Sequence, residues 1–234
     1  MEQQTPSHNT LPLASPATAR DMQIFVERLR SINSNAAVRL IARGKTAAVL
    51  GCTIEPVGLN DTTPMILGMR AFPLAATAQL DSTVGGFALE QELAEALADS
   101  ATDVVELKIP QVSVNAMWAG ILPPLSGWEK AGEIPFALAR EIGERAVREV
   151  QQALPVAPGQ SLVQNIRAKI WGEPLNADYP EIPRGMAITA LLLGVLPTQN
   201  TALPIMCHGD WTRLNTPAGY VLLGPKNSLG LIQK

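Results

Sequence analysis

The chain has 234 residues, of which 47% are hydrophobic and only 17% are charged, and its formal net charge is −3. This composition is typical of a globular protein and excludes an intrinsically disordered chain. Charged residues are spread along the sequence without a block of five like charges, so the electrostatic footprint of a nucleic-acid or anionic-lipid binder is missing. Low charge together with abundant Ala, Leu and Val favours surfaces that another protein chain covers.

The cysteine content and the apolar runs predict where the protein resides. Cys52 and Cys207 are too few for a disulfide framework. No basic segment precedes an apolar run at the start of the chain, so we expect no signal peptide. The longest apolar run, residues 186–196, is about half as long as a membrane-spanning helix. These features predict a cytoplasmic protein with reduced thiols that has no membrane partner.

The first elements of the chain are a tail and a helix. Residues 1–14 lack periodicity and are expected to form a flexible tail. Ser15 then supplies an N-cap, and Pro16 occupies the first helical position. Apolar residues recur at helical spacing as far as Ile32, which predicts an amphipathic helix.

A small antiparallel sheet is predicted next. β-branched runs on both sides of Gly44-Lys45 indicate a hairpin over residues 37–54. Residues 65–72 resemble a third strand, because they continue the same pattern after a short connection. A helix is expected over residues 86–98, and alternating residues over 104–109 indicate a further strand.

The C-terminal half is predicted to be mainly helical. The longest amphipathic helix is expected over 135–153, and a second over 161–171. The segment 184–196 is apolar on every side, which predicts a helix that is buried all round. Residues 204–214 and 218–223 resemble the two strands of a closing hairpin.

Together these elements predict an α+β fold, in which a small antiparallel sheet with an N-terminal helix precedes a helical C-terminal half closed by a β-hairpin. Residues 15–234 are expected to form a single domain, with 15–111 and 116–234 as its two lobes. Three helices followed by a hairpin also match the element order of a winged helix, so that architecture is an alternative.

A loop with two tryptophans joins the two halves. Two adjacent prolines in it fix φ and lower the entropic cost of ordering the loop. Tryptophan is enriched at interface hot spots, although Trp171 and Trp211 are expected in the core. The candidate interaction residues are Trp118, Pro123, Pro124 and Trp128.

The one dense cluster of reactive residue types contains the pocket candidates Cys207, His208 and Asp210. Adjacent Cys and His residues on a strand point to opposite faces, so Cys207 and His208 do not form a nucleophile and its base. Cys52 is the other thiol that such a reaction would need beside His208. Because the chain has only two histidines, we assign no catalytic, cofactor-binding or metal-binding residue and favour a protein that is not an enzyme.

A nucleic-acid partner is disfavoured by the helix that would have to enter the major groove. A recognition helix offers Arg, Lys, Asn or Gln to bases and phosphates. Segment 184–196 offers only Arg184, at its start. No glycine-rich phosphate-binding motif occurs either, so no nucleotide cofactor is expected.

Several hydrophobic landmarks carry a resemblance to a known group of proteins. They are Trp118-x-Gly-x-Leu-Pro-Pro-x-x-Gly-Trp128, Ile170-Trp171, the Pro183–Leu196 segment ending in Leu-Gly-x-Leu, and Trp211-x-Arg-Leu followed by Gly219-x-Val221. The chain resembles a group of uncharacterised actinobacterial (high-GC Gram-positive) proteins that has no assigned activity. The resemblance implies a cytosolic protein of such a bacterium and transfers no functional residue.

The sequence therefore predicts a non-catalytic cytoplasmic protein that acts through protein–protein contacts, with a homodimer as the favoured assembly. A first alternative is an enzyme or small-ligand binder with a pocket near Trp118, Trp128 and His208. A second is a winged-helix-like nucleic-acid binder.

Overall fold

The computed structural model describes residues 10–56, 61–99, 103–157, 159–199 and 201–225. The chain forms two compact units. The first unit comprises Met1–Gly51 and Arg70–Ala119, and the second comprises Cys52–Met69 and Gly120–Lys234. Each predicted lobe is one continuous stretch of chain. The observed units are not, because segment 52–69 belongs to the second unit although the residues on both sides of it belong to the first. None of the helices in the described ranges is long and apolar enough to cross a membrane.

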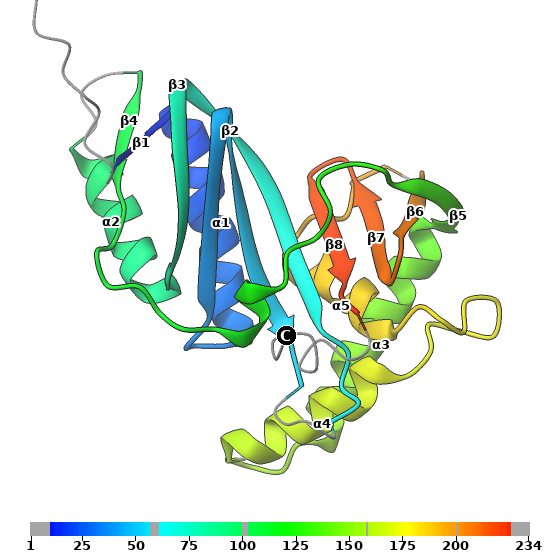
Figure 1. The fold of residues 1–234 in the computed structure, drawn as a ribbon. Coiled ribbons are helices and arrows are strands. Elements are labelled where there is room, and N and C mark those ends of the chain that lie inside the picture. Colours follow the sequence, from blue (N-terminus) through cyan, green and yellow to red (C-terminus); the bar gives the residue numbers. More distant parts are fainter. Residues whose placement is uncertain (1–9, 57–60, 100–102, 158, 200, 226–234) are drawn as a thin grey trace, which may run out of the picture. The chain divides into compact units, whose positions relative to one another are not determined.

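The first unit is built on two helices, α1 (Pro16–Ile32) and α2 (Gly86–Ala98), which pack against each other (Figure 1). Both helices lie where the sequence predicts them. The Ser15 side chain accepts a hydrogen bond from the backbone N–H of Thr18 at 3.1 Å, which confirms the predicted N-cap. A Cβ atom at Gly51 would lie 2.4 Å from Leu29 Cδ1, so glycine is needed where α1 contacts the sheet.

The strands of the first unit are β1 (Thr10–Leu13), β4 (Val105–Lys108) and most of β2 (Ala37–Ile54) and β3 (Ile66–Gly85). β1 pairs antiparallel with both β4 and β3. Gly44 adopts a φ of +62°, and in Figure 1 the β2 ribbon turns and runs back, which confirms the predicted hairpin.

Part of the predicted N-terminal tail is a strand. Residues 1–9 lie outside the described residues, but Thr10–Leu13 form β1. The alternating Leu11 and Leu13 are 1% and 0% exposed, so one face of this strand belongs to the core. A four-residue strand is too short to show its period in the sequence, which explains the error.

The second unit contains β5 (Glu129–Pro135), β6 (Ala202–His208), β7 (Trp211–Thr216) and β8 (Gly219–Leu223). β6, β7 and β8 form an antiparallel meander, β5 pairs with β6, and β8 pairs with the start of β3. Ile205, Leu214 and Val221 are register partners, and all three are buried. This row forms the core face of the sheet.

The helices of the second unit are α3 (Phe136–Ala153), α4 (Gln160–Gly172) and α5 (Arg184–Leu192). α5 contacts α3, α4 and β8, and its residues from Gly185 to Ala190 are buried, which confirms the prediction for this apolar segment. A Cβ atom at Gly185 would lie 2.5 Å from Ile66 Cδ1. The buried hydroxyls of Thr53 and Thr189 satisfy each other at 2.7 Å.

The predicted fold class is wrong. Instead of a small sheet followed by a helical half, eight strands form one antiparallel order, β4-β1-β3-β8-β7-β6-β5, with β2 paired to β3. Strands and helices are therefore mixed in both halves of the chain. The sequence analysis assigned no strand to Glu129–Pro135, because its charged residues and glycine hide the alternation of an edge strand.

The winged-helix architecture and the two-stranded closing hairpin are also incorrect. The segment 204–214 is two strands, β6 and β7, separated by a turn in which Gly209 has a φ of +54°. The C-terminal strands therefore form a three-stranded meander. α5 forms the interior of the second unit, so its residues are not available for a DNA groove.

Candidate functional site

The segment 121–128, which we name the tryptophan loop, presents apolar side chains at the surface of the second unit. Leu125 is 79% exposed and Leu122 is 37% exposed. The Trp128 indole Nε1 donates a hydrogen bond to the Pro124 carbonyl at 2.9 Å, so the loop is closed by its own tryptophan. Pro123 and Pro124 are half-buried and restrict φ between the two leucines. The exposed leucines are thus held on a stiff support.

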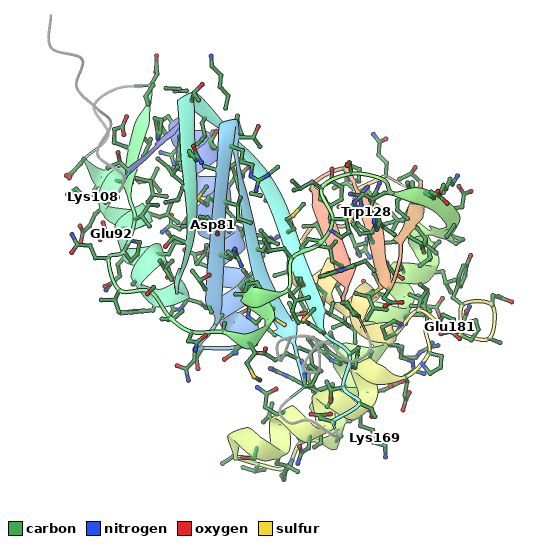
Figure 2. All side chains as sticks on the ribbon, in the orientation of Figure 1. Asp81, Glu92, Lys108, Trp128, Lys169 and Glu181 are labelled. Atoms are coloured by element: carbon green, nitrogen blue, oxygen red, sulfur yellow. The ribbon has the colours of Figure 1, made fainter. Side chains whose placement is uncertain are left out.

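Arg213 on β7 fastens the tryptophan loop to the sheet. Its guanidinium carbon lies 4.3 Å from the centroid of the Trp128 ring and 4.8 Å from that of Tyr220 on β8. Its Nε donates to Asn215 Oδ1 at 2.8 Å. Figure 2 shows Trp128 beside the strands that carry these residues. Two aromatic faces and one hydrogen bond orient this guanidinium.

His208, at the end of β6, holds the other side of the loop. Its Nδ1 lies 2.9 Å from the Gly127 carbonyl oxygen, and its ring meets Trp128 edge-on with centroids 6.0 Å apart. A carbonyl oxygen only accepts, so Nδ1 carries a proton. Gly127 has a φ of +78°, and a Cβ atom there would lie 2.9 Å from His208 Cε1. Only glycine fits this position without displacing the histidine.

The candidate interaction residues thus divide between the units. Pro123, Pro124 and Trp128 are in the tryptophan loop, whereas Trp118 is in the 3₁₀ turn η1 (Met117–Gly120) and is only 3% exposed. Arg39 donates to the Ala119 carbonyl and holds Asp81 through two bonds of 2.8 and 2.9 Å. Trp118 therefore occupies a core position. Of the expected pocket residues, the structure brings Trp128 and His208 together.

The two thiols have no role beside His208 in the part of the chain that the structure describes. Cys52 Sγ lies 3.1 Å from the Ile54 carbonyl oxygen, and burial raises the thiol pKa well above its ordinary value. It is a neutral thiol at neutral pH and therefore a poor nucleophile. Cys207 Sγ lies 4.0 Å from Thr212 Oγ1, and Asp210 is exposed in the β6–β7 turn. Among the described residues, no group of three His, Cys, Asp or Glu side chains is placed to hold a metal ion.

A shallow hollow of about 360 Å³ lies elsewhere in the second unit, lined by Glu133, Pro135, Tyr179, Thr201 and Ala202. The Tyr179 hydroxyl donates to the Glu133 carbonyl at 2.8 Å, and the Glu133 carboxylate is paired with Lys130 at 2.9 Å. The Tyr179 hydroxyl and the Glu133 carboxylate are therefore already engaged, unlike the converging free polar groups of a typical ligand site.

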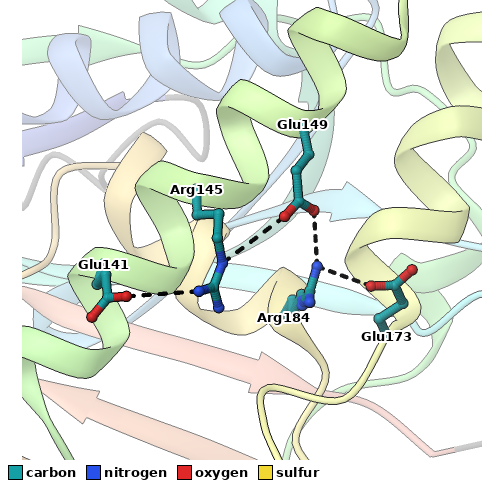
Figure 3. Close-up of polar contacts among 5 residues, drawn as sticks. All are labelled: Glu141, Arg145, Glu149, Glu173 and Arg184. Atoms are coloured by element: carbon teal, nitrogen blue, oxygen red, sulfur yellow. Dashed lines mark hydrogen bonds and ion pairs between the residues drawn. The ribbon is translucent and has the colours of Figure 1, made fainter.

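The densest charge cluster of the second unit joins its helices (Figure 3). Arg184 Nη1 lies 2.9 Å from a carboxylate oxygen of Glu149 on α3 and 2.9 Å from one of Glu173, which follows α4. Arg145 lies between Glu141 and Glu149 at 3.7 and 3.9 Å. The two guanidinium groups offset two of the three carboxylate charges, and both are already paired, so this cluster connects α3, α4 and α5 and offers no free cation to a ligand.

Sequence reasoning missed Arg213, Tyr220 and Leu125. The signal was the alternation Trp211-x-Arg213-x-Asn215, which places these side chains on one face of a strand. Because β6 and β7 were assigned to a single strand, this face was not recognised. Leu125 resembles any loop leucine, and only its accessibility in the folded chain distinguishes it.

Two family models match the chain, and together they cover most of it. Residues 6–120 match the Domain of unknown function (DUF8010), and residues 123–228 match the Domain of unknown function (DUF8185). The boundary between these matches lies next to the boundary between the two units at Ala119 and Gly120. The DUF8185 match includes Leu125, Trp128, His208 and Arg213, whereas Leu122 lies one residue before it.

Solved structures with a similar arrangement include two proteins from Pseudomonas aeruginosa. One is the DNA polymerase III subunit beta, which is 12% identical, with 97% of this chain and 68% of that chain covered and a TM-score of 0.44. Another is a DNA polymerase sliding clamp with ligand, also 12% identical, with 92% and 64% covered and a TM-score of 0.45. This chain thus spans about two thirds of the length of each.

A third solved structure is PF-8, the DNA polymerase accessory subunit from Kaposi's sarcoma-associated herpesvirus. It is 12% identical, with 93% of this chain and 99% of that chain covered and a TM-score of 0.41. No curated protein matches the sequence.

Proposed function

We propose that this protein is a non-catalytic protein-recognition module that binds a partner chain through the tryptophan loop. The observation that carries the proposal is the exposure of Leu125 and Leu122 on a loop that Trp128 and His208 hold in place. Exposed leucines on a mobile loop would be unremarkable, because single apolar residues are common on surfaces. On a stiff support they form a preorganised contact.

The energetics of this loop suit binding. Full burial of a fully exposed leucine side chain contributes about 1.5–3 kcal/mol, so Leu125, which is 79% exposed, can supply most of this and Leu122, which is 37% exposed, a smaller share. Trp128 and Arg213 are of the residue types that dominate interface hot spots. The prolines and the indole hydrogen bond lower the conformational entropy that binding would otherwise cost.

Two kinds of occupant fit such a site, a different protein or a second copy of this chain. The sequence favours a homodimer, in which the tryptophan loop would pack against a second copy. Sedimentation velocity at micromolar concentration distinguishes them, since a dimer that Leu125→Ser dissociates identifies the second copy. The cytoplasm is the proposed location, on the basis of two free cysteines.

Catalysis, small-ligand binding and nucleic-acid binding have weaker support. An enzyme or small-ligand binder needs converging polar groups, which neither the hollow at Glu133 nor the neutral Cys52 thiol supplies. Nucleic-acid binding through α5 conflicts with the burial of that helix. Salt-dependent retention on DNA is the separate test for that partner.

The direct test is a selection of displayed random peptides on the intact protein. Peptides selected by the wild-type protein should lose binding to the double variant Leu122→Ser/Leu125→Ser. Leu162→Ser is the matched control, because Leu162 is 42% exposed on α4 of the same unit. The proposal is overturned if the wild-type protein sediments as a monomer and selects no peptide whose binding is lost when Leu125 is replaced.

A further inference from the structure

We infer that the partner presents a carboxylate to Arg213, so that the tryptophan loop recognises an acidic segment with an adjacent apolar side chain. This inference rests on the proposed function and names the chemistry of its partner. It starts from a difference among the arginines of the chain.

Arg213 forms none of the ion pairs among the residues that the structure describes. Six other arginines each have a carboxylate within 4.0 Å, namely Arg30, Arg39, Arg70, Arg140, Arg145 and Arg184. Arg213 has instead two aromatic rings and the side-chain oxygen of Asn215. Arg20, Arg43 and Arg148 form no ion pair among the described residues either, but Arg213 is the one of these four whose guanidinium is held over two aromatic rings, so its charge is oriented and open to a carboxylate from a partner.

The terminal nitrogens of Arg213 are available to such a group. Only Nε has a hydrogen-bond partner among the described residues, and neither terminal nitrogen belongs to the buried unpartnered atoms. Partial burial lowers the pKa of Arg213, with the Tyr220 hydroxyl acting in the opposite direction. A carboxylate bound there would offset the lost hydration of the cation.

The geometry fits a carboxylate better than a phosphate. A guanidinium presents parallel N–H donors that match the two oxygens of a carboxylate, and the rings of Trp128 and Tyr220 hold its plane. A phosphate dianion would need a second cation. Lys130, two residues after Trp128, is paired with Glu133 at 2.9 Å. The exposed leucines belong to the loop that Trp128 closes, and they add the apolar half of the recognition.

The test uses a peptide that the wild-type protein selects and that depends on Leu125. Three synthetic forms are compared by fluorescence anisotropy: the selected Asp or Glu peptide, its Asn or Gln version, and a phosphoserine version. On wild-type protein the amide version should bind about tenfold more weakly, because a charge-assisted pair is lost. This comparison leaves the protein unchanged, so misfolding cannot explain the result.

Protein variants complete the test. Arg213→Gln should remove the preference for the acidic peptide, and Arg213→Lys should restore only part of it, since lysine keeps the charge without the planar donors. Leu125-dependent peptides that contain no acidic residue and bind Arg213→Gln equally well would overturn this inference and leave the proposed function standing. If the phosphoserine peptide bound tenfold more tightly than the acidic one, Arg213 would be a phosphopeptide-binding residue, and the inference that it binds a carboxylate would be overturned.

Discussion

Two arginines of the second unit show how one residue type serves different purposes. Arg184 is 20% exposed and is held by Glu149 and Glu173, both from its own chain. Arg213 is also partly buried, but among the described residues it contacts two aromatic rings and an amide oxygen and no carboxylate. The charge of Arg184 is thus paired within its own unit, although its Nε is buried without a hydrogen-bond partner. The charge of Arg213 is oriented but has no carboxylate partner among the described residues, which is the state expected of a binding residue before its partner arrives.

The largest effect on stability is expected when Arg184 is replaced. Arg184→Gln leaves Glu173 without the cation that pairs with it and leaves Glu149 with only the longer contact to Arg145, and should lower the free energy of unfolding by about 2 kcal/mol. Arg140→Gln is the control, because its pair with Glu144 is exposed and should contribute less than about 0.5 kcal/mol. Urea unfolding measures both. Equal losses would mean that the cluster in Figure 3 is only a surface feature.

A smaller effect on stability is expected when Arg213 is replaced. Arg213→Gln removes two cation–aromatic contacts and should cost about 1 kcal/mol, well below the cost at Arg184. The same urea titrations give this difference. If Arg213→Gln destabilised the protein as much as Arg184→Gln, Arg213 would be a structural residue and the contrast would fail.

Glu55 is the acidic counterpart of Arg213, because burial raises its pKa and no cation pairs with it among the described residues. A raised pKa means that the folded protein binds this proton more tightly than the unfolded chain does. Its favourable contribution is therefore complete at acidic pH and is lost as the pH rises through the folded pKa. Glu55→Gln should raise the unfolding midpoint at neutral pH, and this gain should shrink below the ordinary carboxyl pKa. Glu106→Gln on the exposed face of β4 should show no such gain.

The smallest effect on stability is expected at Leu125. Leu125→Ser should change the free energy of unfolding by less than about 0.5 kcal/mol, because a side chain that is 79% exposed loses little on truncation. Thermal unfolding followed by circular dichroism is sufficient to check this. A clear loss of stability would indicate that Leu125 packs within the protein and would weaken the proposed docking role.

Local sequence signals predicted the helices well. Ser15 and Pro16 marked the start of α1, and the apolar face of segment 184–196 predicted the burial of α5. These features depend on residues within a few positions of each other, so hydrophobic periodicity and capping residues are sufficient. The Gly44 turn was predicted for the same reason.

The sheet was predicted poorly, because the pairing of strands depends on residues far apart in the sequence. β3 pairs with β8 through Leu67 and Leu222, a relation that no local pattern contains. β1 and β5 were missed because one is four residues long and the other carries edge-strand charges. Residues 204–214 were predicted as one strand, whereas a turn at Gly209 and Asp210 separates β6 from β7.

The amino-acid sequence by itself determined the helices and the stiff proline segment, and it indicated Trp128 and His208 as candidate site residues. Only the tertiary structure decided that Trp118 is a core residue, that Trp128 and His208 touch, and that Arg213 contacts two aromatic rings and no carboxylate of the described residues. The physical reason is that the helices and turns are set by neighbours along the chain. Exposure and charge pairing are set instead by neighbours in space, which the register of the sheet brings together.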